Sequence, residues 1–322
     1  MKVNAEHVKE EAEAFDQRIS SRVKAGFIPD LRLAQKCNYF YKSFWRDPHF
    51  INLYLGKINQ KYLNLLNTYS FNGSSILDVG CGAGYMSIEL ARNGYHVTAF
   101  DISKECISEA NKVLSQNPFV DNFGSLNYIT QSLHEASGKF DVVLFSVSLH
   151  HMSDVFGALI KACEMLNPEG ILLCYEPCHD QWEESDAAQV ALMRSLLSLT
   201  GNWFESFDDL NFENTTEGFE RHAQEVLIEY VEERDKNEAG QSPHDNEATG
   251  DEMLIALRSV FEELHYEAGH SFIYRMLGGV RGSEEVIANV ADLLAAYDEY
   301  SVRMGNMNPN GFYFVGRKKN EN

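Results

Sequence analysis

The chain has 322 residues, of which 44% are hydrophobic and 23% are charged, and its formal net charge is −21 at pH 7. This composition is typical of a soluble globular protein with a large buried core. The strong negative charge disfavours binding to nucleic acid or to an anionic membrane, because both attract basic surfaces.

The cysteines and the N-terminal residues indicate the cellular compartment. Six cysteines are scattered along the chain without a C-x-x-C pair, which argues against a disulfide framework. Residues 2–13 are charged and lack the apolar centre of a signal peptide. The longest apolar runs have the length of strands, so we expect no membrane span. We therefore expect a cytoplasmic protein of one elaborated domain or two.

Residues 1–70 are predicted to form helices that precede a cofactor-binding core. Residues 39–50 are rich in aromatic side chains, and Pro48 is expected to interrupt the helical pattern there. Residues 51–67 carry apolar side chains at helical spacing, which predicts a second helix.

Residues 76–85 combine an apolar run, an embedded acid and a glycine at every second position. Gly80, Gly82 and Gly84 let the backbone turn sharply and approach a ligand closely. The start of the helix that follows offers unpaired N–H groups and a positive dipole end. The spacing is not the dinucleotide G-x-G-x-x-G, because Tyr85 stands where its third glycine is needed.

A second strand over residues 96–100 ends in Asp101, where an acid can accept hydrogen bonds from both hydroxyls of a ribose. Strands and helices then alternate with short connections. This alternation predicts a parallel sheet covered by helices. The predicted elements are a helix from Ser103 to Leu114, strands at 126–130 and 140–146, a helix at 155–166, a turn at 167–170 and a fifth strand at 171–175.

The pattern changes after Glu176. Residues 179–250 are acidic and helical in parts. A helix is predicted from Asp251 through Leu264, followed by a strand near 271–276. A further helix at 286–297 and a turn at 308–311 precede the last strand at 312–316.

The order strand, acid, glycine loop, helix, strand and acid resembles the class I S-adenosylmethionine-dependent methyltransferases, most closely over residues 70–180. The resemblance implies an α/β, Rossmann-like fold. Its mostly parallel seven-stranded sheet has helices on both faces, a last strand antiparallel to the fifth, and a helical cap over the substrate. The implied segments are an N-terminal helical lid (1–70), a cofactor-binding core (71–178), a helical insertion (179–250) and a C-terminal part of the core with a further insertion (251–322).

The resemblance also implies the residues that bind S-adenosylmethionine. In the family, the glycine loop holds the methionine part of the cofactor and the acid ending the second strand holds its ribose. Many members place an acid after the third strand, but residues 129–133 contain none, so Ser132 or the local backbone is expected there. The predicted cofactor-binding residues are Asp78, Gly80, Cys81, Gly82, Gly84, Asp101, Ile102, Ser132, Leu133, Ser146 and Tyr39.

His151 and Glu176 are the predicted catalytic residues, because they follow the fourth and fifth strands, where the family's acceptor meets the methyl group. A base is needed only if the acceptor arrives protonated, and imidazole titrates near neutrality. The alternative for His150 and His151 is that one of them fills the helix start or bonds to the backbone. The alternative for Glu176 is to cap the backbone turn before Pro177.

Two further interpretations remain open from the sequence. His150, His151, His179 and Asp180 are candidates for a metal site, but no H-x-x-x-H or H-E-x-x-H spacing occurs, so we predict no metal. Residues 39–50 are either a lid that closes over the cofactor, with Tyr39 or Tyr41 near its polar end, or a hydrophobic contact of helix on core.

The sequence thus predicts S-adenosylmethionine-dependent methyl transfer to a small molecule, with the methylated atom (oxygen, nitrogen or carbon) and the oligomeric state left open. One alternative is a tRNA or protein methyltransferase, which the acidity disfavours. Another is a cofactor-binding scaffold protein without transferase activity. The glycine spacing disfavours an NAD-dependent oxidoreductase.

Overall fold

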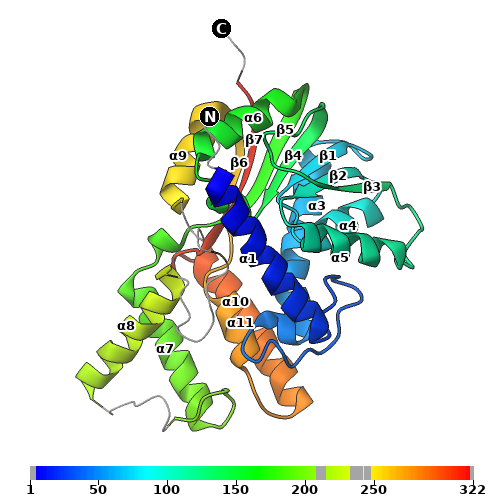
Figure 1. Ribbon diagram of the computed structural model, residues 1–322. Coiled ribbons are helices and arrows are strands. Elements are labelled where there is room, and N and C mark those ends of the chain that lie inside the picture. Colours follow the sequence, from blue (N-terminus) through cyan, green and yellow to red (C-terminus); the bar gives the residue numbers. More distant parts are fainter. Residues whose placement is uncertain (1–4, 208–214, 233–241, 243–247, 320–322) are drawn as a thin grey trace.

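A mixed sheet forms the centre of the computed structural model, which describes residues 5–207, 215–232, 242 and 248–319 (Figure 1). Its strands are β1 (Ser75–Val79), β2 (His96–Asp101), β3 (Ser125–Thr130), β4 (Phe140–Ser146), β5 (Leu166–Pro177), β6 (Phe261–Ala268) and β7 (Gly311–Lys318). Within the described residues they form one seven-stranded sheet in the order β3-β2-β1-β4-β5-β7-β6. Strands β1 to β5 pair in parallel, and β7 runs antiparallel to β5 and β6.

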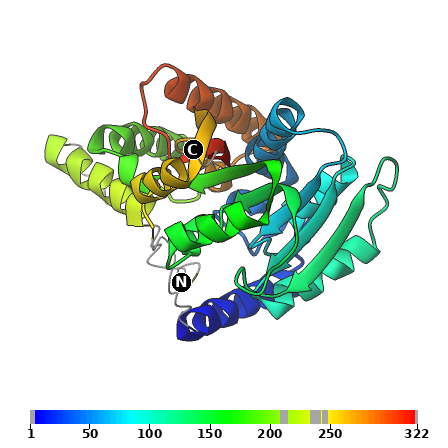
Figure 2. The ribbon, with the colours of Figure 1, turned by 90° about the horizontal axis from the view of Figure 1, so that it is seen from above.

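Helices cover both faces of the sheet (Figure 2). Helices α3 (Lys57–Tyr69), α4 (Tyr85–Arg92) and α5 (Lys104–Ser115) pack on one face, and α6 (Val155–Met165) and α9 (Gly250–Val260) pack on the other. The predicted fold class is therefore confirmed. Short crossovers place a helix between successive parallel strands. These helices form layers on the two sides of the sheet, and the layers bury both of its apolar faces.

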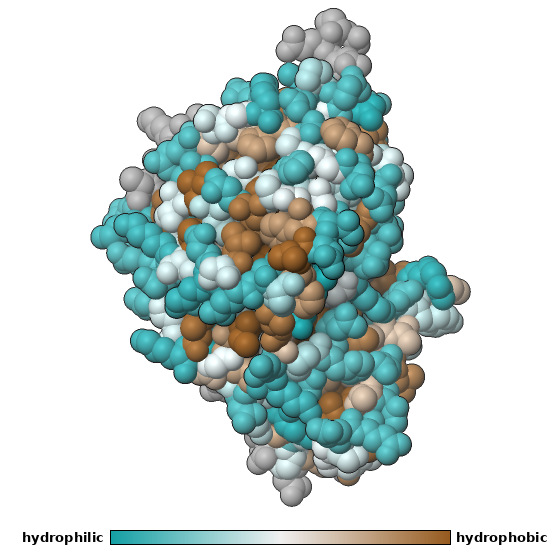
Figure 3. Space-filling view, turned by 90° about the vertical axis from the view of Figure 1, so that its right-hand side faces the viewer, coloured by the Kyte–Doolittle hydropathy of each residue, from teal (hydrophilic) through white to brown (hydrophobic). Residues whose placement is uncertain are grey.

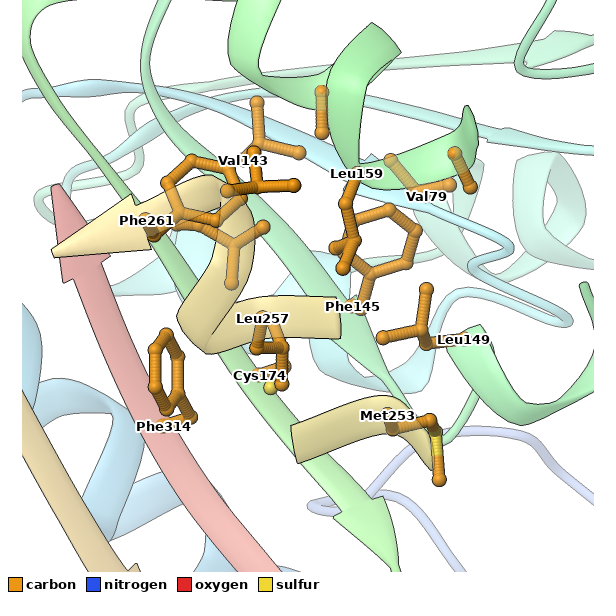
Figure 4. Packing of buried hydrophobic residues seen from close by; sticks show 14 of the residues in the cluster. Val79, Val143, Phe145, Leu149, Leu159, Cys174, Met253, Leu257, Phe261 and Phe314 are labelled. Carbon is orange, nitrogen blue, oxygen red and sulfur yellow. The ribbon is translucent and has the colours of Figure 1, made fainter. Parts of the chain in front are cut away.

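Alternate residues of the central strands feed two separate cores. Ile76 and Leu144 pack toward α3 and α4, whereas Leu77 and Phe145 pack toward α6 and α9. Figure 4 shows the second of these cores, in which side chains from α6, α9, β4 and β7 meet. Both faces of β1 and β4 are buried, which explains why these strands are almost entirely apolar.

A third core lies in the cap formed by α7 (Glu184–Leu199), α8 (Thr216–Glu232), α10 (Ile273–Met276) and α11 (Glu284–Arg303). Helices α7 and α8 extend away from the sheet (Figure 1). The cap core includes Phe50 from the N-terminal region, so part of the aromatic stretch 39–50 packs as a hydrophobic contact. The segments 1–4, 208–214, 233–241, 243–247 and 320–322, which belong to the predicted lid, insertion and C-terminal part, lie outside the described residues.

The N-terminal region contains α1 (Ala5–Lys24), the 3₁₀ turn η1 (Phe44–Arg46), α2 (Pro48–Ile51) and η2 (Asn52–Gly56) before α3. Pro48 begins α2 at its first turn, where Asp47 accepts a hydrogen bond from the N–H of His49 at 2.9 Å. A proline is tolerated there because the N–H groups in the first turn of a helix have no intrahelical partner, so the lack of an N–H costs no hydrogen bond. The predicted helix at 51–67 is present but begins with the π-helical turn η2.

Two predicted elements near the C-terminus are wrong. The helix predicted through Leu264 ends at Val260, and the strand predicted at 271–276 lies earlier, at β6. Residues 273–276 form α10, because the carboxylate of Asp298 accepts hydrogen bonds from the backbone N–H groups of Phe272 (2.7 Å) and Ile273 (3.0 Å). An acceptor from α11, remote in sequence, thus fixes a helix start that the local sequence does not signal.

The turn predicted at 167–170 falls inside the bounds of β5, beside a shift in the pairing register between β4 and β5.

At the surface, hydrophilic residues dominate the outline of the face in Figure 3, and apolar residues gather toward its middle. Among the described residues, we find no helix with the length and apolar character needed to cross a bilayer.

Candidate functional site

A cavity of about 1080 Å³ lies at the carboxyl ends of the parallel strands. The edge of the sheet there is where open α/β folds bind ligands. The lining comes from the glycine loop, the ends of β2 and β4, the segment after β3, helix α1, and the cap helices α7 and α8. One space therefore connects the predicted cofactor-binding core with the cap.

The glycine loop turns sharply out of β1. Gly80 has φ +70°, and a Cβ atom there would come within 2.9 Å of Cβ of Ser148. Gly84 has φ +80° and immediately precedes α4, and its carbonyl accepts a hydrogen bond from the hydroxyl of Tyr128 at 2.9 Å. These two positions require glycine because an L side chain would be strained in this backbone conformation and would also clash.

Asp78 lies at the base of the loop and is almost fully buried. Its Oδ2 accepts a hydrogen bond from Oγ of Ser87 at 2.6 Å, whereas its Oδ1 has no hydrogen-bond partner among the described residues. Burial raises the pKa of Asp78 to about 6. A buried acceptor on the cavity wall with an unfilled lone pair fits a ligand that donates a hydrogen bond or carries a positive charge.

Asp101 ends β2 and lines the same cavity, together with Cys81 and Ile102. Its Oδ2 accepts a hydrogen bond from the N–H of Gly82 and its Oδ1 accepts one from the N–H of Ser103, both at 2.8 Å. Burial raises the pKa of Asp101, which these two backbone N–H groups oppose. Each oxygen retains lone-pair capacity, so the carboxylate can hold the loop and a ligand hydroxyl together.

The segment after β3 contributes Ser132 and Leu133 to the lining. The N–H and Oγ of Ser132 both donate to Oε2 of Glu135, each at 2.8 Å. Glu135 is exposed and is not among the lining residues, so no acid from this segment faces the cavity.

The end of β4 is strained. Ser146 accepts a hydrogen bond from the hydroxyl of Tyr62 at 2.9 Å, and the next residue, Val147, has φ +56°. A β-branched residue in this region of backbone space is an outlier that surrounding structure must enforce. The N–H of Val147 donates to the carbonyl of Tyr175 at 2.9 Å, which helps to hold it.

Glu176 lies beneath this loop, fully buried, and is not among the residues that line the cavity. Its Oε1 accepts hydrogen bonds from the N–H groups of Ser148 and Leu149, both at 2.9 Å. Its Oε2 lies 2.8 Å from Nδ1 of His150. The geometry therefore matches the structural alternative for Glu176 and His150, which together shape the loop after β4.

His151 does line the cavity, but α1 covers it. Its Nδ1 lies 3.5 Å from Oε2 of Glu11, and its ring meets that of Phe15 edge-on at 5.5 Å. By contrast, the side chain of Tyr39 is 49% exposed and does not line the cavity; Ser43, Phe44 and Trp45 of the same aromatic stretch do.

The residues considered for a metal site have other contacts. Nδ1 of His179 bonds to Oδ1 of Asn310, and Asp180 accepts hydrogen bonds from the N–H groups of Gly250 (2.6 Å) and Asp251 (3.2 Å) at the start of α9. In the part of the chain that the structure describes, no group of three or more His, Cys, Asp or Glu residues is placed to hold a metal ion.

The cap supplies functional candidates that sequence reasoning missed. Arg194 on α7 pairs with Glu229 on α8 through two hydrogen bonds of 2.6 and 3.0 Å, and its guanidinium lies 5.5 Å from the ring centroid of Trp203. Burial opposes ionisation of Glu229, but Arg194 outweighs it and lowers the pKa of Glu229 to about 2. No spacing in the sequence links these residues, since they converge only when α7 and α8 pack together.

His270 was also missed. It follows β6 and lines the cavity, and its Nδ1 lies 3.4 Å from Oδ2 of Asp298. The only local sign in the sequence is a histidine after a short strand, and that strand was predicted at the wrong place.

Comparisons with known proteins bear on the family and the fold of this chain. A sequence model of the family described as "Methyltransferase domain" matches residues 51–224. The ubiquinone biosynthesis O-methyltransferase of Xylella fastidiosa (strain M23) is 34% identical over 134 residues, which are 41% of this chain and 54% of that protein. The mitochondrial ubiquinone biosynthesis O-methyltransferase of Schizosaccharomyces pombe is 37% identical over 105 residues, which are 32% of this chain and 38% of that protein. The chain thus spans about half, or less, of the length of these curated relatives.

Among solved structures, the magnesium protoporphyrin IX methyltransferase of Synechocystis PCC 6803 with bound SAH is similar, with a TM-score of 0.50 and 15% identity over 82% of this chain and 94% of that one. This likeness concerns the fold alone. The family match covers more than half of the 322 residues and contains β1 to β5 with the glycine loop. This chain therefore belongs to the methyltransferase domain family.

Proposed function

We propose that this protein transfers a methyl group from S-adenosylmethionine to a small-molecule acceptor. The observation that carries the proposal is the single cavity that joins the glycine loop, Asp78 and Asp101 to a cap lined by aromatic and charged side chains. Family membership supports the reaction type, and the O-methyltransferase names of the curated relatives favour an oxygen acceptor.

The residues present fit the cofactor. Asp78 offers an unfilled, buried acceptor atom for a positively charged group, and Asp101 offers carboxylate oxygens for ribose hydroxyls. No atom lies within 4 Å of a Cβ atom built on Gly82, so a ligand has room to approach this part of the loop. Bound there, S-adenosylmethionine supplies an electrophilic methyl group on a positively charged sulfur. The proposed binding set is Asp78, Gly80, Cys81, Gly82, Gly84, Asp101, Ile102, Ser132, Leu133 and Ser146; the place of Tyr39 at the surface argues against including it.

The acceptor is proposed to occupy the cap end of the cavity. Aromatic rings of Phe44, Trp203 and Phe204 line it there, beside the ion pair of the buried Arg194 and the half-buried Glu229. Such rings bind an apolar or planar body, and the ion pair offers polar groups that fix its orientation. Because the cap encloses this space, a small molecule fits it better than a tRNA or a protein does.

The first experiment incubates the protein with methyl-labelled S-adenosylmethionine and a cell extract. We expect label in low-molecular-weight material that resists nuclease and protease. Label in RNA or protein would support the tRNA or protein methyltransferase instead. No labelled product, with S-adenosylhomocysteine still bound, would support the scaffold protein.

The second experiment measures binding of S-adenosylhomocysteine and of NAD by calorimetry. We expect binding of the first and none of the second, and Asp101→Ala should weaken the first by about 2–4 kcal/mol, because two charge-assisted hydrogen bonds to the ribose are lost. Asp121→Ala, which changes an exposed carboxylate, is the control. Unchanged affinity in Asp101→Ala would contradict the assignment of the ribose site.

His151 as the acceptor's base stays a prediction. If it takes the acceptor's proton, His151→Ala should lower the turnover rate by roughly 10²–10⁴-fold without changing the affinity for S-adenosylhomocysteine. Its contact with Glu11 supports the alternative, in which His151 holds α1 over the cavity. Full turnover with faster cofactor dissociation in this variant would favour that alternative.

A further inference from the structure

His270 is held at the edge of the sheet where the cavity lies. Strand β6 is antiparallel to β7, which is antiparallel to β5, so β6 ends at the same edge as the parallel strands. The residues after it are fixed to the start of β7. The N–H of Gly269 donates to the carbonyl of Gly311, and the N–H of Asn310 donates to the carbonyl of His270, both at 2.7 Å. His270 therefore sits on a rigid backbone and lines the cavity.

One ring nitrogen of His270 faces a fixed carboxylate. Asp298 on α11 is buried, and its Oδ1 accepts hydrogen bonds from the N–H groups of Phe272 and Ile273. Its Oδ2 lies 3.4 Å from Nδ1 of His270, a distance that can shorten to a hydrogen bond when a ligand closes the site. A carboxylate at Nδ1 favours the tautomer with the proton on that nitrogen, which leaves the lone pair on Nε2.

The second ring nitrogen has no partner from the chain. Nε2 of His270 is buried without a hydrogen bond among the described residues. The ring lies 5.2 Å from that of Tyr54, and Tyr54 lies 6.0 Å from Tyr274; both tyrosines line the cavity. Tyr54 belongs to the π-helical turn η2, a distortion that is frequent at functional sites. A buried, unsatisfied basic nitrogen at this place indicates a ligand as its partner.

The other histidines near the loop after β4 do not combine a carboxylate at Nδ1 with a buried Nε2 that lacks a hydrogen bond in the described residues. Nδ1 of His150 bonds to Glu176, and Nδ1 of His151 lies against Glu11. His179 bonds to Asn310. Nε2 of neither His150 nor His151 is among the buried atoms that lack a hydrogen bond in the described residues, and the partner of His179 is an amide oxygen, which cannot stabilise an imidazolium as a carboxylate does.

We propose that His270 is the catalytic base that removes the acceptor's proton, with Asp298 as its positioning residue. The inference rests on the proposed function and names the residue that activates the acceptor. A hydroxyl or amine of the acceptor gives its proton to Nε2. The freed lone pair forms the new bond to the methyl carbon, and the electrons of the broken carbon–sulfur bond stay on sulfur, which becomes a neutral thioether. The imidazolium formed at His270 is stabilised by Asp298 and later loses its proton to water.

The test uses the low-molecular-weight compound that the wild-type protein labels in a cell extract, purified and used as the acceptor. His270→Ala should lower kcat by about 10²–10⁴-fold. Affinity for S-adenosylhomocysteine should stay within about twofold of the wild type, because Asp78 and Asp101 bind that ligand elsewhere. Added imidazole should restore part of the rate, since it can occupy the space that the side chain leaves.

Two further variants separate catalysis from folding. His270→Leu removes both nitrogens and keeps most of the bulk, so its melting temperature should stay close to that of the wild type, because the carboxylate of Asp298 keeps its backbone N–H donors when Nδ1 is removed. Asp298→Asn keeps one side-chain oxygen, which can still accept hydrogen bonds from the N–H groups of Phe272 and Ile273. It removes the negative charge beside His270, so it should lower kcat by roughly tenfold with an unchanged KM for the acceptor. His49→Ala is the matched control, because His49 forms a surface pair with Asp292 at 2.8 Å and is outside the cavity lining.

Full turnover in His270→Ala would overturn the inference and leave the proposed function intact. A large fall in melting temperature in His270→Leu, with no rescue of His270→Ala by imidazole, would assign His270 a structural role and also overturn it. A wild-type protein that labels nothing would overturn the proposed function and the inference together.

Discussion

At the scale of single residues, Asp78 couples the charge of the proposed cofactor site to pH. Because burial raises its pKa from an ordinary 3.8 to about 6, the folded chain holds a proton between these values that the unfolded chain has released. The contribution of Asp78 to stability is therefore greatest below about pH 4 and is lost as the pH rises toward 6. A positively charged ligand group beside Oδ1 would offset this cost by stabilising the ionised form.

We accordingly predict that Asp78→Asn raises the free energy of unfolding at pH 7–8 by about 3 kcal/mol and that this gain vanishes near pH 4. Urea unfolding at several pH values measures it. The same variant should bind S-adenosylhomocysteine more weakly at pH 7, because the carboxylate is missing. Equal stability of the variant and the wild type across this range would contradict the pKa and its cause.

Glu176 illustrates a different use of a buried carboxylate. Its oxygens accept hydrogen bonds from three backbone N–H groups and face the imidazole of His150 beneath the strained Val147. Glu176→Gln places an amide N–H₂ among donors, so we predict a loss of about 2–4 kcal/mol in the free energy of unfolding. Glu169→Gln, at an exposed position, is the control. Unchanged stability with lost turnover would instead restore the catalytic role predicted from the sequence.

At the scale of elements, α1 bridges two strand ends across the cavity. Near its N-terminus, Glu11 meets His151, which follows β4. Further along, Oδ1 of Asp16 accepts hydrogen bonds from Oγ of Ser103 (2.5 Å) and from the N–H of Glu105 (3.0 Å), at the start of α5 after β2. A helix joined to both sides of the site can close over a ligand.

If α1 is a lid, bound S-adenosylhomocysteine should slow amide exchange in α1 and around Ser43 to Trp45. A stabilisation of 1–2 kcal/mol corresponds to about 5–30-fold slower exchange. Asp16→Ala should reduce this protection, because it removes the contact with α5. Helix α9, which packs on the far face of β5 and β7, should not change and serves as the internal control. Identical exchange in α1 with and without ligand would leave it only a packing role.

At the scale of the whole molecule, the cavity has two ends built by different parts of the chain. The glycine loop and the ends of β1 and β2 form the proposed cofactor end, and residues of the cap form the proposed acceptor end. The two ends are lined by different elements of the chain, so we expect their contributions to binding to be largely separable.

We predict that Phe204→Ala lowers kcat/KM for the acceptor by roughly tenfold through lost apolar contact, with unchanged affinity for S-adenosylhomocysteine. Asp101→Ala should weaken the binding of S-adenosylhomocysteine and leave the binding of the acceptor unchanged. Phe71→Ala, which removes an aromatic ring that is 60% exposed and outside the cavity lining, is the control. Equal loss of both ligands in Phe204→Ala would show that the two ends are coupled.

The sequence by itself determined the central part of this protein, from β1 to β5. The glycine loop, Asp78, Asp101 and the strand–helix alternation up to β5 all depend on near neighbours in the chain, because periodicity, turn residues and short crossovers are local properties. These local patterns were enough to predict the sheet and the family, and they indicate the edge of the sheet at which we propose that ligands bind.

Only the tertiary structure decided the acceptor end and the roles of the buried acids. Asp298 accepts hydrogen bonds from the N–H groups at the start of α10, about 25 residues away in sequence. The chain therefore forms α10 where the sequence predicted a strand, and the observed strand β6 lies earlier. The same carboxylate meets His270, and α7 meets α8 through Arg194 and Glu229. Such pairs depend on which helix faces pack together. The surroundings of a buried carboxylate then decide whether both of its oxygens are used by the chain, as in Glu176, or one oxygen has no partner among the described residues, as in Asp78.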